Sequence, residues 1–151
     1  MLTLGPFQVS PDGTLAPRAP GLRPMVRYAW RGRACAAEVT EVGLRLVALA
    51  GRIPSTARRG VDRRAVASAV GAMRGNLPPG LRLHLLADHR VVLRAEDVVA
   101  ERPVRAHALV AGMVRFALSL DGLLDELDAL GAGLDQPVRA STAPPPASRA
   151  A

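Results

Sequence analysis

The sequence predicts an α+β fold, in which an antiparallel sheet carries a short helix and a long C-terminal helix packed on one face. Several short segments alternate apolar and polar residues and are joined by short turns, which is typical of antiparallel strands. Two other segments repeat apolar residues at helical spacing. The chain has 151 residues, of which 49% are hydrophobic, and this is enough for one domain with a buried core.

Composition divides the chain into three regions. Residues 1–24 are expected to form an extended, proline-rich N-terminal segment, with a tight turn at Asp12 and Gly13. Residues 25–133 are expected to form the α+β domain. Residues 134–151 contain four prolines among alanine, serine and threonine and show no apolar periodicity, so a disordered tail is expected there.

Turn and breaker residues set the boundaries of the predicted strands. Arg31 and Gly32 stand between two alternating runs, as do Asp88 and His89, and both pairs are predicted turns. Pro54 ends another run because proline cannot donate to a strand ladder. The strands expected for the main sheet are residues 25–30, 34–39, 43–50, 81–86 and 90–94.

Two helices are predicted from apolar spacing. The first runs from Asp62, which suits the N-cap position, to Met73, with Val66 and Val70 on its apolar face. The second begins near Pro103 and carries an apolar stripe that steps alternately by four and three residues over about six turns. The stripe consists of Leu109, Met113, Phe116, Leu120, Leu123, Leu127 and Leu130, and Val110, Val114, Ala117 and Leu124 are expected to widen it.

Residues suited to catalysis or metal binding are few. The three histidines are His84, His89 and His107, and none has a serine, cysteine or carboxylate at a diagnostic spacing. Cys35 is the only cysteine, which excludes a disulfide within the chain and a site built from several thiolates, and we expect it to be buried. The sequence therefore predicts no enzyme activity, no cofactor and no metal.

The sequence also bears on location. No uninterrupted apolar run reaches about 18 residues, so no membrane-spanning helix is expected. The N-terminus has neither the basic region nor the apolar region of a signal peptide, and a cytoplasmic location is the expectation.

Positive charge is abundant but needs interpretation. The 20 basic residues are all arginine, and the formal net charge is +7. Such a charge favours a nucleic-acid partner. However, the absence of lysine and the abundance of alanine, glycine and proline are typical of a GC-rich genome, in which arginine replaces lysine. The placement of the arginines therefore matters more than their number.

Alternation predicts that basic residues gather on one face of the sheet. If the leucines and valines of the 81–94 hairpin face the helices, the residues between them face outward. Tyr28 and Trp30 are expected on the opposite face, which leaves the basic face without aromatic rings for base stacking. This face is either simply solvated or a docking surface for an acidic protein segment or a nucleic acid. The residues expected on it are Arg27, Arg45, Arg82, His84, Arg90 and Arg94.

The long helix has its charges at the unfavourable ends. Arg102 and Arg105 precede it, and acidic residues crowd its C-terminal end, where the helix dipole disfavours them. The acidic residues are Asp121, Asp125, Glu126 and Asp128. Either solvation or pairing with arginine, from the sheet or from a second subunit, would offset this cost.

The apolar stripe of the same helix is longer than an ordinary strand. From Leu109 to Leu130 it extends roughly 33 Å, whereas strands of five or six residues span about 17–20 Å. Its C-terminal end, with Leu123, Leu127 and Leu130, is therefore expected to overhang the sheet. A second subunit, a partner or the N-terminal segment would have to cover these leucines.

The order of strands, helix, hairpin and long helix resembles the type III secretion chaperone-like fold, which includes the YbjN-like group of bacterial proteins. The resemblance is carried by Leu81–Leu85, Arg90–Arg94 and the helix Val104–Leu130. It implies a small, non-enzymatic protein, often a homodimer, that holds an extended segment of a partner protein. It implies no catalytic residues.

Taken together, these features predict a protein-binding adaptor or chaperone-like module that forms a homodimer. An apolar surface rimmed by arginine would hold an acidic segment of the partner. The alternative is a nucleic-acid-associated protein that uses the arginine face against phosphate.

Overall fold

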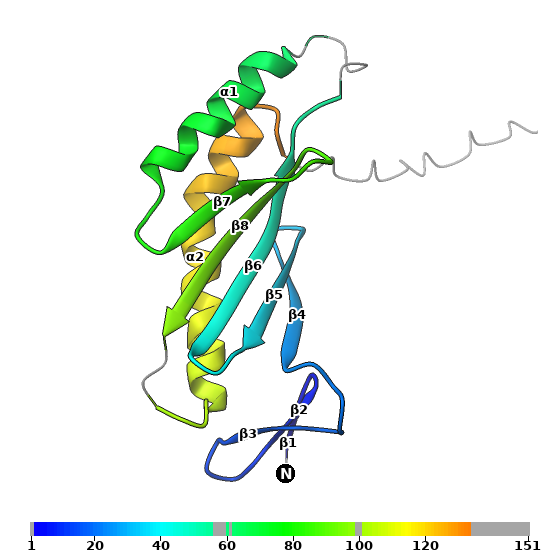
Figure 1. Ribbon diagram of the computed structural model, residues 1–151, viewed down its shortest axis with the longest axis vertical. Helices are drawn as coiled ribbons and strands as arrows, with labels where there is room; N and C mark the ends of the chain where they lie inside the picture. Colours follow the sequence, from blue (N-terminus) through cyan, green and yellow to red (C-terminus); the bar gives the residue numbers. More distant parts are fainter. Residues whose placement is uncertain (1, 56–59, 61, 99–100, 134–151) are drawn as a thin grey trace, which may run out of the picture.

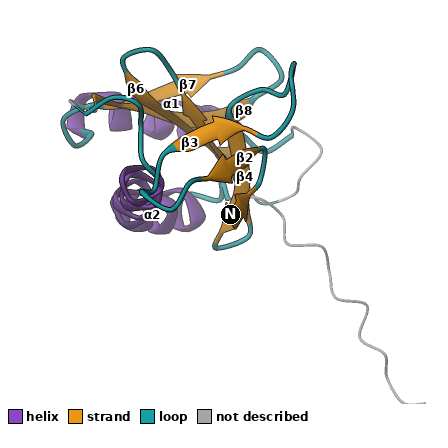
Figure 2. Ribbon diagram, turned by 90° about the horizontal axis from the view of Figure 1, so that it is seen from below, coloured by secondary structure: helices purple, strands orange, loops and turns teal. Residues whose placement is uncertain are grey.

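A five-stranded antiparallel sheet with two helices on one face forms the body of the molecule (Figures 1 and 2). The computed structural model describes residues 2–55, 60, 62–98 and 101–133. The α+β fold class predicted from the sequence is confirmed. The predicted disordered tail, residues 134–151, lies outside the described residues.

The main sheet has the strand order β4-β5-β6-β8-β7, and every neighbouring pair is antiparallel. A smaller sheet, β1-β2-β3, is built from the N-terminal residues. The strands are β1 Leu2–Leu4, β2 Phe7–Val9, β3 Leu15–Pro17, β4 Met25–Trp30, β5 Arg33–Val39, β6 Gly43–Arg52, β7 Leu81–Leu85 and β8 Arg90–Val98. The helices are α1 Arg63–Met73, the 3-10 turn η1 Arg74–Asn76, and α2 Ala106–Ala129.

The local signals in the sequence explain these boundaries. Arg31 and Gly32 both have positive φ, of 50° and 76°, which is the conformation that a tight two-residue hairpin requires. The carboxylate of Asp62 accepts hydrogen bonds from the backbone amides of Arg64 and Ala65 and so caps α1. In the N-terminal turn, the backbone amide of Thr14 donates to Asp12 and holds the pKa of that carboxyl below its ordinary value.

A single core lies between the main sheet and the two helices. Inward-facing residues of the strands supply Leu44, Leu46 and Leu93, which are almost completely buried. The apolar stripe of α2 packs against them, and α1 adds Val66, Val70 and Met73. In Figure 1 both helices lie behind the sheet, so the other face of the sheet remains uncovered by helices.

The prediction that the C-terminal end of α2 overhangs the sheet is wrong. Leu127 is completely buried, Leu123 is 7% exposed, and Leu130 packs against the core, all within one chain. The reason is the length of β6, whose ten residues span about 33 Å and so match the stripe. The chain beyond α2 also returns to this strand, where the backbone amide of Arg52 donates to the carbonyl of Ala132 at 2.8 Å.

The N-terminal segment packs at the opposite end of α2. The amide of Ala106 donates to the carbonyl of Gly13 at 2.8 Å, and Thr14 forms an isolated β-bridge with Arg105. Phe7 is 2% exposed and belongs to the core. This segment therefore covers the beginning of α2, not the leucines at its end.

Two of the residues expected to widen the buried stripe are instead exposed. Val110 is 46% exposed and Val114 is 51% exposed. Measured around the helix from Leu109, at the centre of the buried side, Val110 lies at about 100° and Val114 at about 140°, which turns both away from the core. Ala117 and Leu124, in contrast, are buried as expected.

Helix α2 is long and apolar enough to span a membrane by length and composition alone, although the count of uninterrupted apolar residues did not indicate this. Its stripe is buried against the sheet, and Asp121 in its C-terminal half bonds to Trp30. The place of this stripe in the core accounts for part of the apolar character of α2, and a single helix of this length and composition is only weak evidence for a membrane span.

Two glycines test how the end of α2 packs on the sheet. A Cβ at Gly51 would overlap the backbone carbonyl of Ala132, so Gly51→Ala should lower the free energy of unfolding by roughly 1–3 kcal/mol or more. Gly122 lies on the exposed side of α2, where an added methyl group would meet no other atom within 4 Å, so Gly122→Ala should raise it by about 0.5–1 kcal/mol. Urea unfolding of the two variants measures both effects. A Gly51→Ala protein as stable as the wild type would contradict the packing of Ala132 against β6.

Candidate functional site

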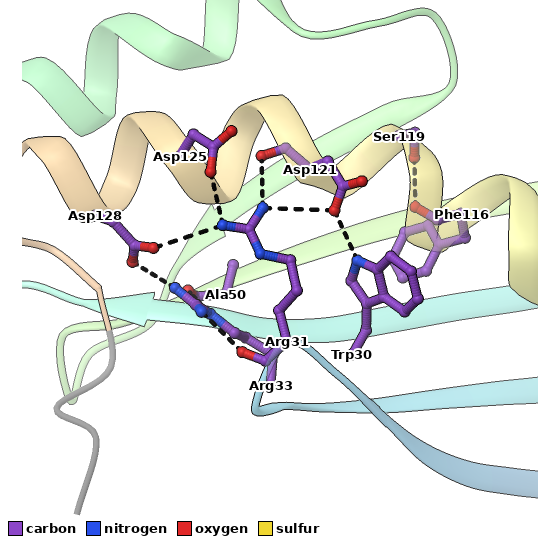
Figure 3. A network of polar contacts seen from close by, with 9 residues as sticks. All are labelled: Trp30, Arg31, Arg33, Ala50, Phe116, Ser119, Asp121, Asp125 and Asp128. Atoms are coloured by element: carbon purple, nitrogen blue, oxygen red, sulfur yellow. Dashed lines mark hydrogen bonds and ion pairs between the residues drawn. The ribbon is translucent and has the colours of Figure 1, made fainter. Parts of the chain in front are cut away.

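A cluster of charged residues joins the turn between β4 and β5 to the C-terminal half of α2 (Figure 3). The guanidinium of Arg31 donates to a carboxylate oxygen of Asp125 at 2.6 Å and to the backbone carbonyl of Asp121 at 3.1 Å. The indole nitrogen of Trp30 donates to the carboxylate of Asp121 at 2.9 Å. The hydrogen bond to Asp125 raises the pKa of Arg31. Three of the four acidic residues that oppose the helix dipole, Asp121, Asp125 and Asp128, thus pair with Arg31 of the β4–β5 turn or Arg33 of β5 in the same chain.

Arg33 is the buried member of this cluster, with only 7% of its surface exposed. Its guanidinium bonds the carboxylate of Asp128 and also donates to the backbone carbonyls of Arg31, at 2.9 Å, and Ala50, at 3.5 Å. A buried charge is tolerated only when it is paired and hydrogen-bonded, and Arg33 meets both conditions. Because these groups bind one another, we interpret the cluster as a structural clamp and not as a binding site.

Arg33 is not among the residues that the sequence patterns predicted for a site. The signal was present, because Arg33 has the same phase along β5 as the buried residues Cys35 and Ala37. An arginine in the buried phase of a strand indicates a charge that needs an internal partner.

The six polar residues predicted to share the outer face of the sheet do so. Cross-strand pairing places Arg82 opposite Arg94, and a single row across the sheet reads Arg27, Ala36, Val47, Arg94 and Arg82. Arg45 is two residues from Val47 along β6 and therefore faces the same way. By the same alternation His84 follows Arg82 on β7, and Arg90 precedes Val92 on β8. We call this surface the outer arginine face.

The centre of the outer arginine face is apolar. Leu49 of β6 pairs with Val92 of β8, which pairs in turn with His84 of β7. Val92 is 7% exposed yet does not belong to the main core, because its neighbours on the outer face bury it. Together with Val47, these residues place an apolar strip directly beside the row of arginines.

A hollow of about 560 Å³ opens at the β7 side of this face. It is lined by Arg45, Gly80, Arg82, His84, Arg94, Ala95 and Glu96. Arg45 is partly neutralised, since it lies 3.6 Å from carboxylate oxygens of both Glu38 and Glu96. Arg82 and Arg94 have no ion pair within the described part of the chain.

The other predicted site residues are not available for binding a partner. Arg90 lies on the outer face but at the hairpin end, where its side chain pairs with Asp88. Leu123 and Leu127 are buried in the core, and Leu130 packs against it, so the prediction that these leucines bind a partner is wrong.

Features that would support catalysis are weak in the described residues. No group of three or more histidine, cysteine or acidic side chains stands close enough there to hold a metal ion. Cys35 is buried, and burial raises the pKa of its thiol, so the reactive thiolate is disfavoured. His89 lies at a hairpin turn, where it contacts the guanidinium of Arg63 at 2.7 Å.

The aromatic residues of β4 face the helices, as the alternation predicted. Tyr28 pairs with Cys35 in the inner row, and Trp30 bonds to α2. The hydroxyl of Tyr28 is buried with no hydrogen-bond partner among the described residues, and burial raises the pKa of Tyr28. The outer arginine face therefore has no contribution from these rings.

Comparison with protein-family models, with curated proteins and with solved structures found no match to this chain. Function is consequently inferred from the geometry of the outer arginine face.

The structural clamp has a direct test. Removing the carboxylate with Asp128→Ala leaves Arg33 buried without its counter-charge. The expected loss of stability is on the order of 3 kcal/mol, near the lower end for a broken buried pair because Asp128 is 44% exposed at its side chain.

The matched control is Asp125→Ala, because the Asp125 side chain is 70% exposed and its pair with Arg31 is solvated. Surface pairs contribute at most about 1 kcal/mol, so this variant should remain close to the wild type. Thermal or urea unfolding compares the two. Equal losses in both variants would show that Arg33 does not depend on Asp128.

Proposed function

We propose that this protein is a non-enzymatic, protein-binding module that holds an extended acidic segment of a partner across the outer arginine face. The observation that carries the proposal is the position of Arg82 and Arg94, which oppose each other directly on neighbouring strands. Like charges in such positions destabilise a sheet by up to about 1 kcal/mol. A bound anionic group would remove this repulsion.

The dimensions of the face suit a short extended segment. Arg82 lies on β7 and Arg27 on β4, which are the two edge strands of the sheet. Four strand spacings separate them, or about 19 Å, which an extended segment of about six residues would cross. Carboxylates at its two ends would meet Arg27 on one side and the Arg82–Arg94 pair on the other.

The apolar strip supports a protein partner over other anions. Val47 and Leu49 are half-buried between the arginines, and a partner segment with aliphatic side chains among its carboxylates would cover them. Arginine is suited to this role because its planar guanidinium binds carboxylates through two parallel hydrogen bonds. The proposal agrees with the resemblance to chaperone-like proteins that hold extended segments, and a cytoplasmic location is part of it.

A nucleic acid is the alternative partner, because the same arginines would bind phosphate. Glu38 and Glu96 beside Arg45 would repel either kind of anion, so they do not distinguish the two partners. One feature of the face disfavours a nucleic acid. The aromatic residues of β4 point to the opposite face, so base stacking finds no ring there.

The experiment is a selection of random displayed peptides on the purified protein, followed by affinity measurements with two variants. Selected peptides should combine Asp or Glu with aliphatic residues. The variant Arg82→Glu/Arg94→Glu should bind them about tenfold more weakly or worse, because it reverses the charge at one end of the site.

The matched control is Arg64→Glu/Arg74→Glu, which changes net charge equally but alters exposed residues at the two ends of α1, on the covered side of the sheet. It should bind the selected peptides like the wild type. If both variants lose the same peptide affinity, the loss is explained by net charge alone, and this result would count against the proposal. A gel shift with DNA or RNA that weakens steeply with salt would instead establish the nucleic-acid alternative.

A further inference from the structure

A row of apolar side chains remains exposed along α2, outside the part of the helix surface that packs against the core. Val110, Val114 and Leu118 are 46%, 51% and 61% exposed, and they repeat every four residues. The other large exposed apolar residues of the described chain, Leu2, Leu22, Val42 and Leu85, lie on different elements or loops. Towards the C-terminal end of the same side, Arg31 of the β4–β5 turn contacts Asp121 and Asp125.

We propose that a second copy of this chain packs on this side of α2, with the two helices antiparallel and the two-fold axis at Val114. This surface is separate from the outer arginine face, and the proposal does not rest on the proposed function. The residues that form it, called here the α2 stripe, are His107, Val110, Val114, Leu118 and Asp121.

The spacing of the α2 stripe is symmetric about Val114. Its steps are three, four, four and three residues, and at about 100° per residue all five positions fall within about 80° of one another. In an antiparallel pair centred on Val114, Val110 of one copy therefore opposes Leu118 of the other. His107 in the same way opposes Asp121. A symmetric interface requires this kind of self-complementarity.

Charge fixes the antiparallel orientation. The first turn of α2 contains no acidic residue and its last turn no basic one. Arg102 precedes the helix and is exposed, and Asp125 near its end keeps 70% of its side chain exposed despite its pair with Arg31. An antiparallel partner brings each acidic end beside the positive N-terminal end of the other helix, whereas a parallel partner would place like charges together.

Asp121 can take part without leaving the clamp. One of its carboxylate oxygens accepts from Trp30 and Arg31, and the side chain remains 42% exposed. The second oxygen accepts no hydrogen bond in the described part of the chain and is available to a donor such as His107 of the other copy.

Cysteine cross-linking tests the geometry. Val114→Cys places the same thiol of both copies at the axis, and mild oxidation should give a covalent dimer. Val110→Cys mixed with Leu118→Cys should cross-link as well. Val110→Cys alone should not, because its two copies would lie about 12 Å apart along the helices, beyond the reach of a disulfide. The wild type is the control, since its one cysteine, Cys35, is buried.

Light scattering and sedimentation between about 1 µM and about 1 mM then measure association without cross-links. Leu118→Asp should shift the protein to monomer while its helical circular dichroism and melting stay near those of the wild type, because Leu118 is exposed. Leu85→Asp, at another exposed leucine, should leave the dimer intact.

Three results would overturn the proposal: a wild type that is monomeric throughout this range, a dimer that survives Leu118→Asp, or efficient cross-linking of Val110→Cys alone. Peptide binding at the outer arginine face is measured separately on the Leu118→Asp protein. Its outcome therefore distinguishes a failure of the dimer from a failure of the proposed function.

Discussion

The pairing of buried Arg33 with Asp128 constrains much of the architecture. Arg33 opens β5 directly after the β4–β5 turn, and Asp128 lies in the last turn of α2, so one ion pair joins residues 95 positions apart. Because a buried guanidinium is costly without its counter-charge, the end of α2 is held over the inner face of β5 and β6. The chain then returns through Ala132 to Arg52, which closes the layer around Leu127. The leucines at the end of α2 are buried as a result, and the opposite sheet face is left free.

Local chemistry explains why the elements were predictable from sequence, and non-local pairing explains where the prediction ended. The Arg31 and Gly32 turn and the Asp62 cap depend on a few neighbouring residues, so their positions could be inferred directly. The length of β6 could not, because Gly51 and Arg52 continue the strand only through their pairing with β8 across a bulge. That extension decided whether the buried apolar residues of α2, from Leu109 to Leu130, would overhang the sheet.

The outer arginine face could be predicted from the sequence in part, whereas the exposed side of α2 could not. Strand alternation has a period of two, so the phase that brings Arg27, Arg82 and Arg94 to one face could be inferred without knowing the register. That Arg82 stands opposite Arg94 depends on the hairpin register and needed the structure. On α2 the apolar pattern is broad, and spacing alone could not show whether Val110 and Val114 would turn toward the sheet or away from it.

The outer arginine face and the α2 stripe lie on opposite sides of the sheet, which has a consequence for binding. Two copies joined through α2 would each turn the sheet away from the common axis, so neither outer arginine face would be covered by the contact. Such a dimer would present two equivalent faces to one partner or to two. A partner with two acidic segments would bind the second face as an intramolecular step, so its affinity would exceed that of a single segment without any new contact. Dimerisation through α2 would in this way strengthen binding at a face that it does not touch.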